Sequence, residues 1–260
     1  MMLALAVGIS LAAFDGDTVA VRDSARSLNT PPWWEAAVTT SGESFASRLS
    51  AWQSHSLAVR YRGRSQSHAF EAFTARRYSA WNSGFALEES SILGRGAYVA
   101  IRAQLAPGAT IVPRSDISVT WYQTIGGGWE LIPSARLMSF PDDHVPIWGL
   151  GLGRYAGLWY LTGRINQASQ AGEHGVTTSA GVRRYAADAS PDFVDVSVSY
   201  GHEIAVLGPS IVALRRTASA AARGQRMVSR NLGTSLAITY EANASLPDRR
   251  GAALSAFVRW

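Results

Sequence analysis

Serine, histidine and aspartate residues gather near one predicted loop, and together they could perform nucleophilic catalysis. Ser199, His202 and Ser210 flank this loop, and Asp195 lies on the polar face of the strand before it. A hydrolase uses such a set to activate a serine hydroxyl through a histidine base. Serine is common throughout the chain, however, so chance neighbours are frequent. An acyl hydrolase or transferase that modifies lipid A, acting at the outer rim of a membrane barrel, is therefore only an alternative prediction. No catalytic residue is assigned.

Metal and cofactor chemistry has little support in the sequence. The five histidines are scattered and there is no cysteine, whereas metal sites need clustered ligands. Asp142, Asp143 and His144 form one acid–histidine group of a kind that usually makes a turn. The glycines of Gly149–Gly153 lack the strand–turn–helix context and the lysine of a nucleotide loop. We predict no metal site and no cofactor.

Alternation with a period of two predicts an all-β chain. Before the glycines of "TWYQTIGGGWELIPSARL", Ile117, Val119 and Trp121 alternate with polar residues, and Trp129 and Leu131 continue the apolar face after them. This pattern is typical of a hairpin with one apolar and one polar face. The same texture recurs along the chain and predicts about fourteen strands, near residues 34–41, 54–62, 68–78, 83–92, 97–106, 115–124, 129–139, 145–154, 158–165, 177–185, 193–200, 209–218, 229–241 and 251–260.

The composition indicates whether the apolar faces meet a protein core or lipid. Charged residues make up 17% of the chain and hydrophobic residues 47%, and no apolar run is long enough for a transmembrane helix. The arginines are dispersed, which argues against nucleic-acid binding. A soluble β-sandwich or lipocalin-like barrel would carry many charges on its outer face. Short glycine turns that alternate with longer polar loops favour a transmembrane up-and-down β-barrel in the bacterial outer membrane, among outer-membrane lipids and lipopolysaccharide.

Aromatic residues and the C-terminus support the outer-membrane prediction. The chain ends in "GAALSAFVRW", with the terminal Trp260 in phase with the apolar face. An amphipathic last strand that ends on an aromatic residue resembles the signal read by the barrel assembly machinery. Tryptophans near strand ends fit aromatic girdles at the two membrane interfaces: Trp121, Trp129, Trp148, Trp159 and Trp260.

The polar phase must point into the barrel, because an arginine in mid-bilayer costs about 2–4 kcal/mol. Charges of both signs could cross-link into a plugged structural barrel without transport. Alternatively, arginines and tyrosines could line a passive channel or export conduit for a small anionic or saccharide-like solute. The residues predicted to line the lumen are Arg60, Arg102, Arg136, Arg154, Arg164, Arg183, Glu88, Asp116, Glu130, Asp195, Glu241, Tyr98, Tyr122 and Tyr160.

The N-terminal residues resemble a targeting segment. An apolar stretch and a small-x-small site predict a signal peptide over residues 1–13, although the positive n-region is missing. Residues 14–32 read as a short periplasmic leader, and residues 33–260 as the barrel.

Three segments, in this order and spacing, resemble the YaiO family of outer-membrane β-barrels: "VPRSDISVTWYQTIGGGWELIPSARL", "IWGLGLGRYAGLWYLTGRI" and "GVRRYAADASPDF". The matching positions are Pro113 and Arg114, Tyr122, residues 126–130, residues 153–160 and residues 183–185. The resemblance is strong over residues 83–200 and extends back to 54 and on to 260. Pro133 departs from the family pattern and is expected to mark a bulge. The family implies a closed outer-membrane barrel, and it brings no established activity or catalytic residues.

Overall fold

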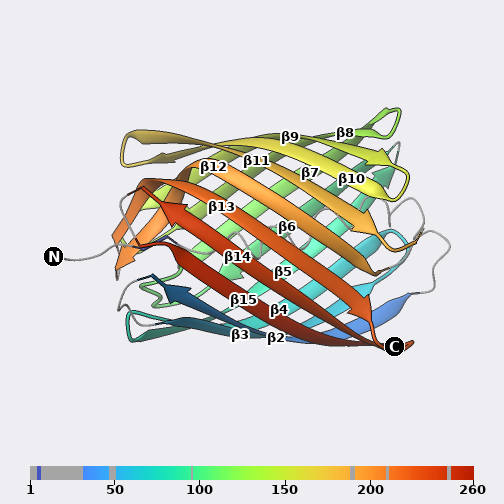
Figure 1. Ribbon diagram of the computed structural model, residues 1–260, viewed down its shortest axis with the longest axis horizontal. Helices are drawn as coiled ribbons and strands as arrows, with labels where there is room; N and C mark the ends of the chain where they lie inside the picture. The colour runs from blue at the N-terminus through green and yellow to red at the C-terminus, as the bar shows by residue number, and fades with distance from the viewer. Residues whose placement is uncertain are drawn as a thin grey trace.

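A computed structural model of the chain describes residues 5–6, 32–46, 51–94, 96–187, 191–208, 211–244 and 247–260. Its main feature is a barrel of fourteen antiparallel strands, β2 to β15, that follow one another around the ring in chain order (Figure 1). The first and last strands pair along their length, from Arg249 against Phe45 to Arg259 against Glu35. The all-β, up-and-down barrel predicted from the alternation is confirmed. In the ranges given above, no helix is long and apolar enough to span a membrane.

All fourteen predicted strands are present, and most are longer than predicted. The largest extensions are at β12 and β13, which form a hairpin that runs beyond its neighbours. The bounds are β2 (Trp33–Phe45), β3 (Trp52–Arg62), β4 (Gln66–Arg77), β5 (Ala80–Gly94), β6 (Ala97–Leu105), β7 (Ser115–Gly126), β8 (Trp129–Ser139), β9 (His144–Ala156), β10 (Trp159–Gln170), β11 (Glu173–Tyr185), β12 (Phe193–Gly208), β13 (Ile211–Met227), β14 (Leu232–Asn243) and β15 (Arg249–Arg259).

The predicted bulge at Pro133 is absent. Pairing between β7 and β8 keeps one register on both sides of the proline, from Thr120 opposite Ser134 to Gln123 opposite Leu131. Pro133 has no N–H to donate to the ladder, so the proline removes one hydrogen bond between the strands. It does not add the extra residue that a bulge would contain. The register of this hairpin shifts instead between Thr124 and Gly126, beside the glycine turn.

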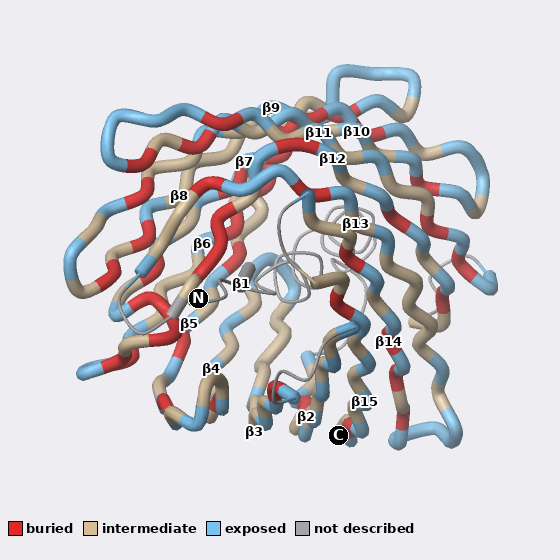
Figure 2. Tube along the Cα trace, turned by 60° about the vertical axis from the view of Figure 1, so that its left-hand side comes forward, coloured by how far each residue is buried: buried red, intermediate tan, exposed pale blue. Residues whose placement is uncertain are grey.

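The strands have two faces, as a membrane barrel requires. Large apolar side chains on one face are exposed, among them Leu57, Leu87, Leu236 and Leu254. The side chains between them are buried or half-buried, which produces the alternation of colours along each strand in Figure 2. In water, so much exposed apolar surface would be unfavourable. In a bilayer this face meets lipid, and the polar face points into the lumen.

The two ends of the barrel differ. At the end that holds Trp33 and Trp260, called here the terminal end, most connections have two to four residues. The exception there is residues 186–192. At the opposite end, called the loop end, the connections range from two to nine residues, and the longest is residues 106–114. Bacterial barrels carry short turns on the periplasmic side and longer loops outside the cell. We therefore assign the loop end to the extracellular side.

Tryptophans lie on the outer face toward both ends. Trp129, Trp159 and Trp260 are exposed at the terminal end, and Trp148, with 65% of its surface exposed, lies toward the loop end. These four agree with the aromatic girdles predicted from the sequence. Trp121 is exposed in the middle of β7 and belongs to neither girdle.

The predicted signal peptide and leader fall almost entirely outside the described residues. The exception is β1 (Leu5–Ala6), a two-residue strand that pairs with Val206 and Ala205 of β12.

The two faces of β15 should respond oppositely to an added charge. Leu254 points outward at mid-strand, whereas its neighbour Ser255 points inward. We expect Leu254→Arg to lower the free energy of unfolding by about 2–4 kcal/mol, because the arginine meets lipid. Ser255→Arg should cost less than about 1 kcal/mol, because its charge reaches water. Reversible denaturant unfolding in bilayers checks both values, and equal losses would contradict the assignment of faces.

Candidate functional site: the barrel lumen

The inner face holds nearly every residue predicted to line the lumen. Arg60, Arg102, Arg136, Arg164, Arg183, Glu88, Asp116, Glu130, Asp195, Glu241, Tyr98, Tyr122 and Tyr160 all lie buried or half-buried in the phase opposite to the exposed apolar side chains.

Arg154 is the exception, and its predicted position in the lumen is wrong. It pairs with Trp129 and Leu161, both exposed on the outer face. On β9 the inner phase falls on the glycines Gly151 and Gly153. The outer phase falls on the leucines and on this arginine. The guanidinium lies 5.0 Å from the ring centroid of Trp129, beside the turn at the terminal end. There its charge can reach the headgroup region, as long basic side chains do.

Charged side chains in the middle of the lumen are joined in ion pairs. Arg102 Nη2 lies 3.0 Å from Glu71 Oε2. Arg136 donates from Nε and Nη2 to the two carboxylate oxygens of Asp116, at 2.8 and 2.5 Å. Two such parallel bonds fix the geometry of both side chains. The arginines therefore brace the wall and do not form an uncompensated cationic ring.

Arg183 and Asp195 make a further pair on β11 and β12. Nε and Nη2 of Arg183 donate to Asp195 Oδ2 at 3.1 and 2.6 Å. The guanidinium also lies 4.2 Å from the ring centroid of Phe193. Only 4% of the arginine side chain is exposed, so its charge depends on this partner.

A second charged group lies at the loop end and surrounds Trp52. Arg249 contacts the carboxylates of Glu43 (3.2 Å) and Glu241, and its guanidinium lies 5.6 Å from the ring centroid of Trp52. The guanidinium of Arg77 lies 4.3 Å from the same centroid. The indole, 3% exposed, therefore contacts two cations, a favourable arrangement for its π-system.

Tyrosines fill the lumen toward the terminal end on the side of β6–β10. Tyr98 and Tyr122 have ring centroids 5.5 Å apart. The hydroxyl of Tyr160 donates to Glu130 Oε2 at 2.9 Å, and Arg164 Nη2 donates to the hydroxyl of Tyr122 at 3.3 Å. Each phenol group has a polar partner or an aromatic neighbour, as buried tyrosines require.

The opposite wall is built from small hydroxylated and alanine side chains and leaves a cavity of about 310 Å³. Hydroxyl groups bond to one another across strands here, as between Thr39 and Ser255 (2.9 Å) and between Ser41 and Ser54 (2.6 Å). From Ser235 to Glu241 on β14 the cavity follows the wall for roughly 20 Å, at about 3.4 Å per residue. Small side chains on this wall are what keep the space open.

The serine, histidine and aspartate residues considered for nucleophilic catalysis do not form an assembled site. The Ser199 hydroxyl faces inward and donates to Glu203 Oε1 at 2.7 Å, whereas His202 is exposed and pairs with Arg216. A serine and a histidine on opposite faces cannot act as nucleophile and base. Ser210 lies outside the described residues. No group of three or more histidine, aspartate or glutamate side chains within the described ranges has the geometry to hold a metal ion.

Several lumen residues escaped the sequence analysis because the strands were predicted too short. Glu43 lies beyond the predicted first strand and Arg249 before the predicted last one, yet each continues the inner phase. Extension of the alternation by two residues at either end would have found them. The hydroxylated wall gave no such signal, because serine and threonine are common on both faces.

The ion pairs of Arg249 should be important for stability. We expect Arg249→Met to lower the free energy of unfolding by about 3–5 kcal/mol, because it leaves two nearly buried carboxylates, Glu43 and Glu241, without their cation. The neighbouring Arg250→Met removes an exposed arginine and should change stability by less than about 0.5 kcal/mol. A heat-modifiability gel series with denaturant checks the difference, and two equally stable variants would refute it.

Comparisons with known proteins agree with this architecture. A polysaccharide outer-membrane secretin is similar in fold, with a TM-score of 0.50 and 7% identity over 88% of this chain and 98% of its own. Omp33 of Acinetobacter baumannii gives a TM-score of 0.49 with 6% identity over 88% of this chain and 99% of its own. At 7% identity the likeness to the secretin concerns the fold alone. No curated protein sequence matches the chain.

The family model for the YaiO membrane β-barrel domain matches residues 35–204, well over half of the chain. This agrees with the resemblance found in the three sequence segments and with the closed barrel on which they lie. The chain is therefore a member of the YaiO membrane β-barrel family, located in the bacterial outer membrane.

Proposed function

We propose that the barrel is a passive conduit for a small, uncharged, saccharide-like solute. The observation that carries this proposal is the hydroxyl-lined cavity of about 310 Å³ along β13–β15, β2 and β3. Its volume lies at the lower end of the range of small-molecule sites, about 300–1,000 Å³. Serine and threonine hydroxyls both donate and accept hydrogen bonds, as the hydroxyls of a sugar do.

The charges of the cavity favour a neutral solute over an anion. Its lining carries four arginines, Arg77, Arg102, Arg223 and Arg249, and five carboxylates, Glu43, Glu71, Asp116, Asp195 and Glu241. Among them Arg102 pairs with Glu71, and Arg249 pairs with Glu43 and Glu241. Because the carboxylates are as close to the lumen as the guanidiniums, the cations do not create a net field that would concentrate anions. Paired charges still present donors and acceptors at fixed positions to a passing polyol.

The alternatives considered from the sequence receive less support. Ser199 and His202 point to opposite faces, so these two described residues do not support the arrangement on which a lipid-A-modifying enzyme would depend. A plugged structural barrel is consistent with the paired charges, but it does not need a continuous wall of small side chains. Silence in the conductance experiment below would favour the plugged barrel.

A bulky side chain on the small-residue wall should obstruct the lumen. Ala221 faces the cavity between Ser197 and Thr239. Ala222 has the opposite phase, because its paired neighbours Val196 and Ile238 are exposed on the outer face. We expect Ala221→Trp to reduce single-channel conductance in a planar bilayer several-fold, because the indole fills space that Ala221 leaves open. Ala222→Trp faces lipid and should conduct as the unmodified protein does. A folded barrel that never conducts, or an equal effect of both variants, would contradict the conduit.

Ion selectivity should respond to the loss of either partner of one pair. Arg102→Gln leaves Glu71 without its cation and should shift the reversal potential in a salt gradient toward cation preference. Glu71→Gln leaves Arg102 uncompensated and should shift it toward anions. Reversal potentials that do not move in either variant would show that this pair lies outside the permeation path.

A further inference from the structure

The hairpin formed by the ends of β12 and β13 leaves the barrel wall. Pairing between β11 and β12 ends where Thr177 meets Gly201, although β11 continues to Glu173. Pairing between β12 and β13 continues beyond this point to Val206 opposite Val212 and, after a register shift, to Gly208 opposite Ile211. The two residues of β1 also pair with this arm, at Ala205 and Val206. The hairpin arms, residues 202–208 and 211–216, are therefore held to each other and not to the wall on the β11 side.

Gly201 is the point of departure and has a backbone that only glycine tolerates. Its φ is +147°, and a Cβ atom there would lie 2.2 Å from the carbonyl oxygen of Val176. Glycine adopts such a conformation without steric cost, which a side chain would prevent. The break in pairing is thus encoded in the sequence.

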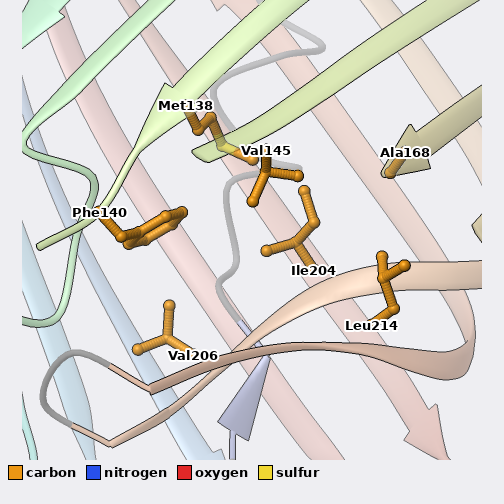
Figure 3. Packing of buried hydrophobic residues seen from close by; sticks show 7 residues of the cluster. All are labelled: Met138, Phe140, Val145, Ala168, Ile204, Val206 and Leu214. Atoms are coloured by element: carbon orange, nitrogen blue, oxygen red, sulfur yellow. The ribbon is translucent and has the colours of Figure 1, made fainter. Parts of the chain in front are cut away.

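The inner side of the hairpin packs into the loop-end mouth. Ile204, Val206 and Leu214 are buried against an apolar group on β8, the β8–β9 turn, β9 and β10: Met138, Phe140, Val145 and Ala168 (Figure 3). Side chains on the inner face of a water-filled lumen would be polar. An apolar cluster on that face shows that the hairpin is a folded part of the mouth and has its own small core.

Two side chains pin the hairpin backbone. Gln170, at the end of β10, donates from Nε2 to the carbonyl of Val212 at 2.6 Å and to Asp143 Oδ2 at 2.7 Å. Tyr78, in the turn between β4 and β5, donates from its hydroxyl to the carbonyl of Val206 at 3.1 Å. In a ring of fourteen strands, β5 and β12 are seven places apart in either direction. The bond from Tyr78 to Val206 therefore joins opposite sides of the mouth.

Tyr78 also joins the hairpin to the charged group at Trp52. The two ring centroids are 5.6 Å apart, edge to face. Tyr78 and Ser79 have φ values of +50° and +66°, a turn conformation usually reserved for asparagine and glycine. A bulky residue held in this region is strained, and here the strained turn places the phenol group between Trp52 and the hairpin carbonyl of Val206.

We propose that this hairpin is a lid over the extracellular mouth of the lumen, with Tyr78 as its latch and Gly201 as its hinge. The wall is complete without the hairpin arms, because β11–β12 pairing ends at Gly201 and the ladder of the ring does not include them. Tyr78 holds the hairpin from the far side at Val206, and Gln170 holds it from β10 at Val212, the residue paired with Val206. Release of the Tyr78 bond removes the only one of these two bonds that crosses the mouth. The lid controls access to the proposed conduit, so this inference rests on the proposed function.

Access to the cavity from outside the cell tests the lid. The chain has no cysteine, so Ala221→Cys places a single thiol on the cavity wall. On intact cells, a membrane-impermeant maleimide should label this thiol slowly in the otherwise unmodified protein. Labelling should be several-fold faster in two further variants. One is Tyr78→Phe, which removes only the latch hydroxyl, and the other replaces residues 203–215 by Asn-Gly between the paired residues His202 and Arg216.

Two controls make the labelling experiment decisive. Tyr240→Phe removes another hydroxyl at the loop end, one that donates to Asp248 at 2.6 Å away from the hairpin, and should leave the rate unchanged. Asp142→Cys, exposed in the β8–β9 turn, should label equally fast in every background. Equal rates for Ala221→Cys with and without the hairpin, in barrels that remain heat-modifiable, would overturn the lid.

The labelling assay needs entry from one mouth only, so it separates the lid from the conduit. Faster labelling in a protein that never conducts would support the lid and refute the conduit. Conductance with unchanged labelling would support the conduit and refute the lid.

Discussion

Closure of the sheet by hydrogen bonds between β2 and β15 is the constraint on which the rest of the structure depends. A bilayer offers no water to an unpaired N–H or C=O group, so a sheet can cross it only when every strand has two neighbours. Here the last strand meets the first along its length, and Trp34 and Trp260 exchange backbone bonds at 2.9 and 3.0 Å. The closed ring then forces alternate side chains into lipid and into the lumen.

The lumen is polar because of this closure, yet its charges are largely neutralised. Arginines that could not face lipid point inward and meet carboxylates on neighbouring strands, as Arg102 meets Glu71 and Arg136 meets Asp116. These pairs tie strands together, while serine, threonine and alanine on the opposite wall preserve space. The same inner face supplies rigidity and, in the proposed conduit, the passage, and the extra length of β12 and β13 forms its proposed lid.

The fold could be predicted from the sequence because strand alternation has a fixed period of two, which reveals both the number of strands and their faces. The positions of the strand ends were harder to predict, and Glu43 and Arg249 were missed for that reason. Arg154 was misplaced because the glycines of β9 left no side chains to mark its inner face. The proposed lid could not be foreseen, because a glycine within a strand pattern, such as Gly201, does not by itself show that the strand leaves the wall there. Long-range contacts such as that of Tyr78 with Val206 depend on the closed ring.

The most direct test of the account is osmotic swelling of proteoliposomes in neutral sugars and in sugar acids of matched size. Because the charges of the lumen are paired, the account predicts that neutral sugars small enough for a cavity of about 310 Å³ enter at least as fast as the corresponding anions. Larger oligosaccharides should be excluded. Uptake of the anions alone, or no uptake of any sugar by a correctly folded barrel, would contradict it.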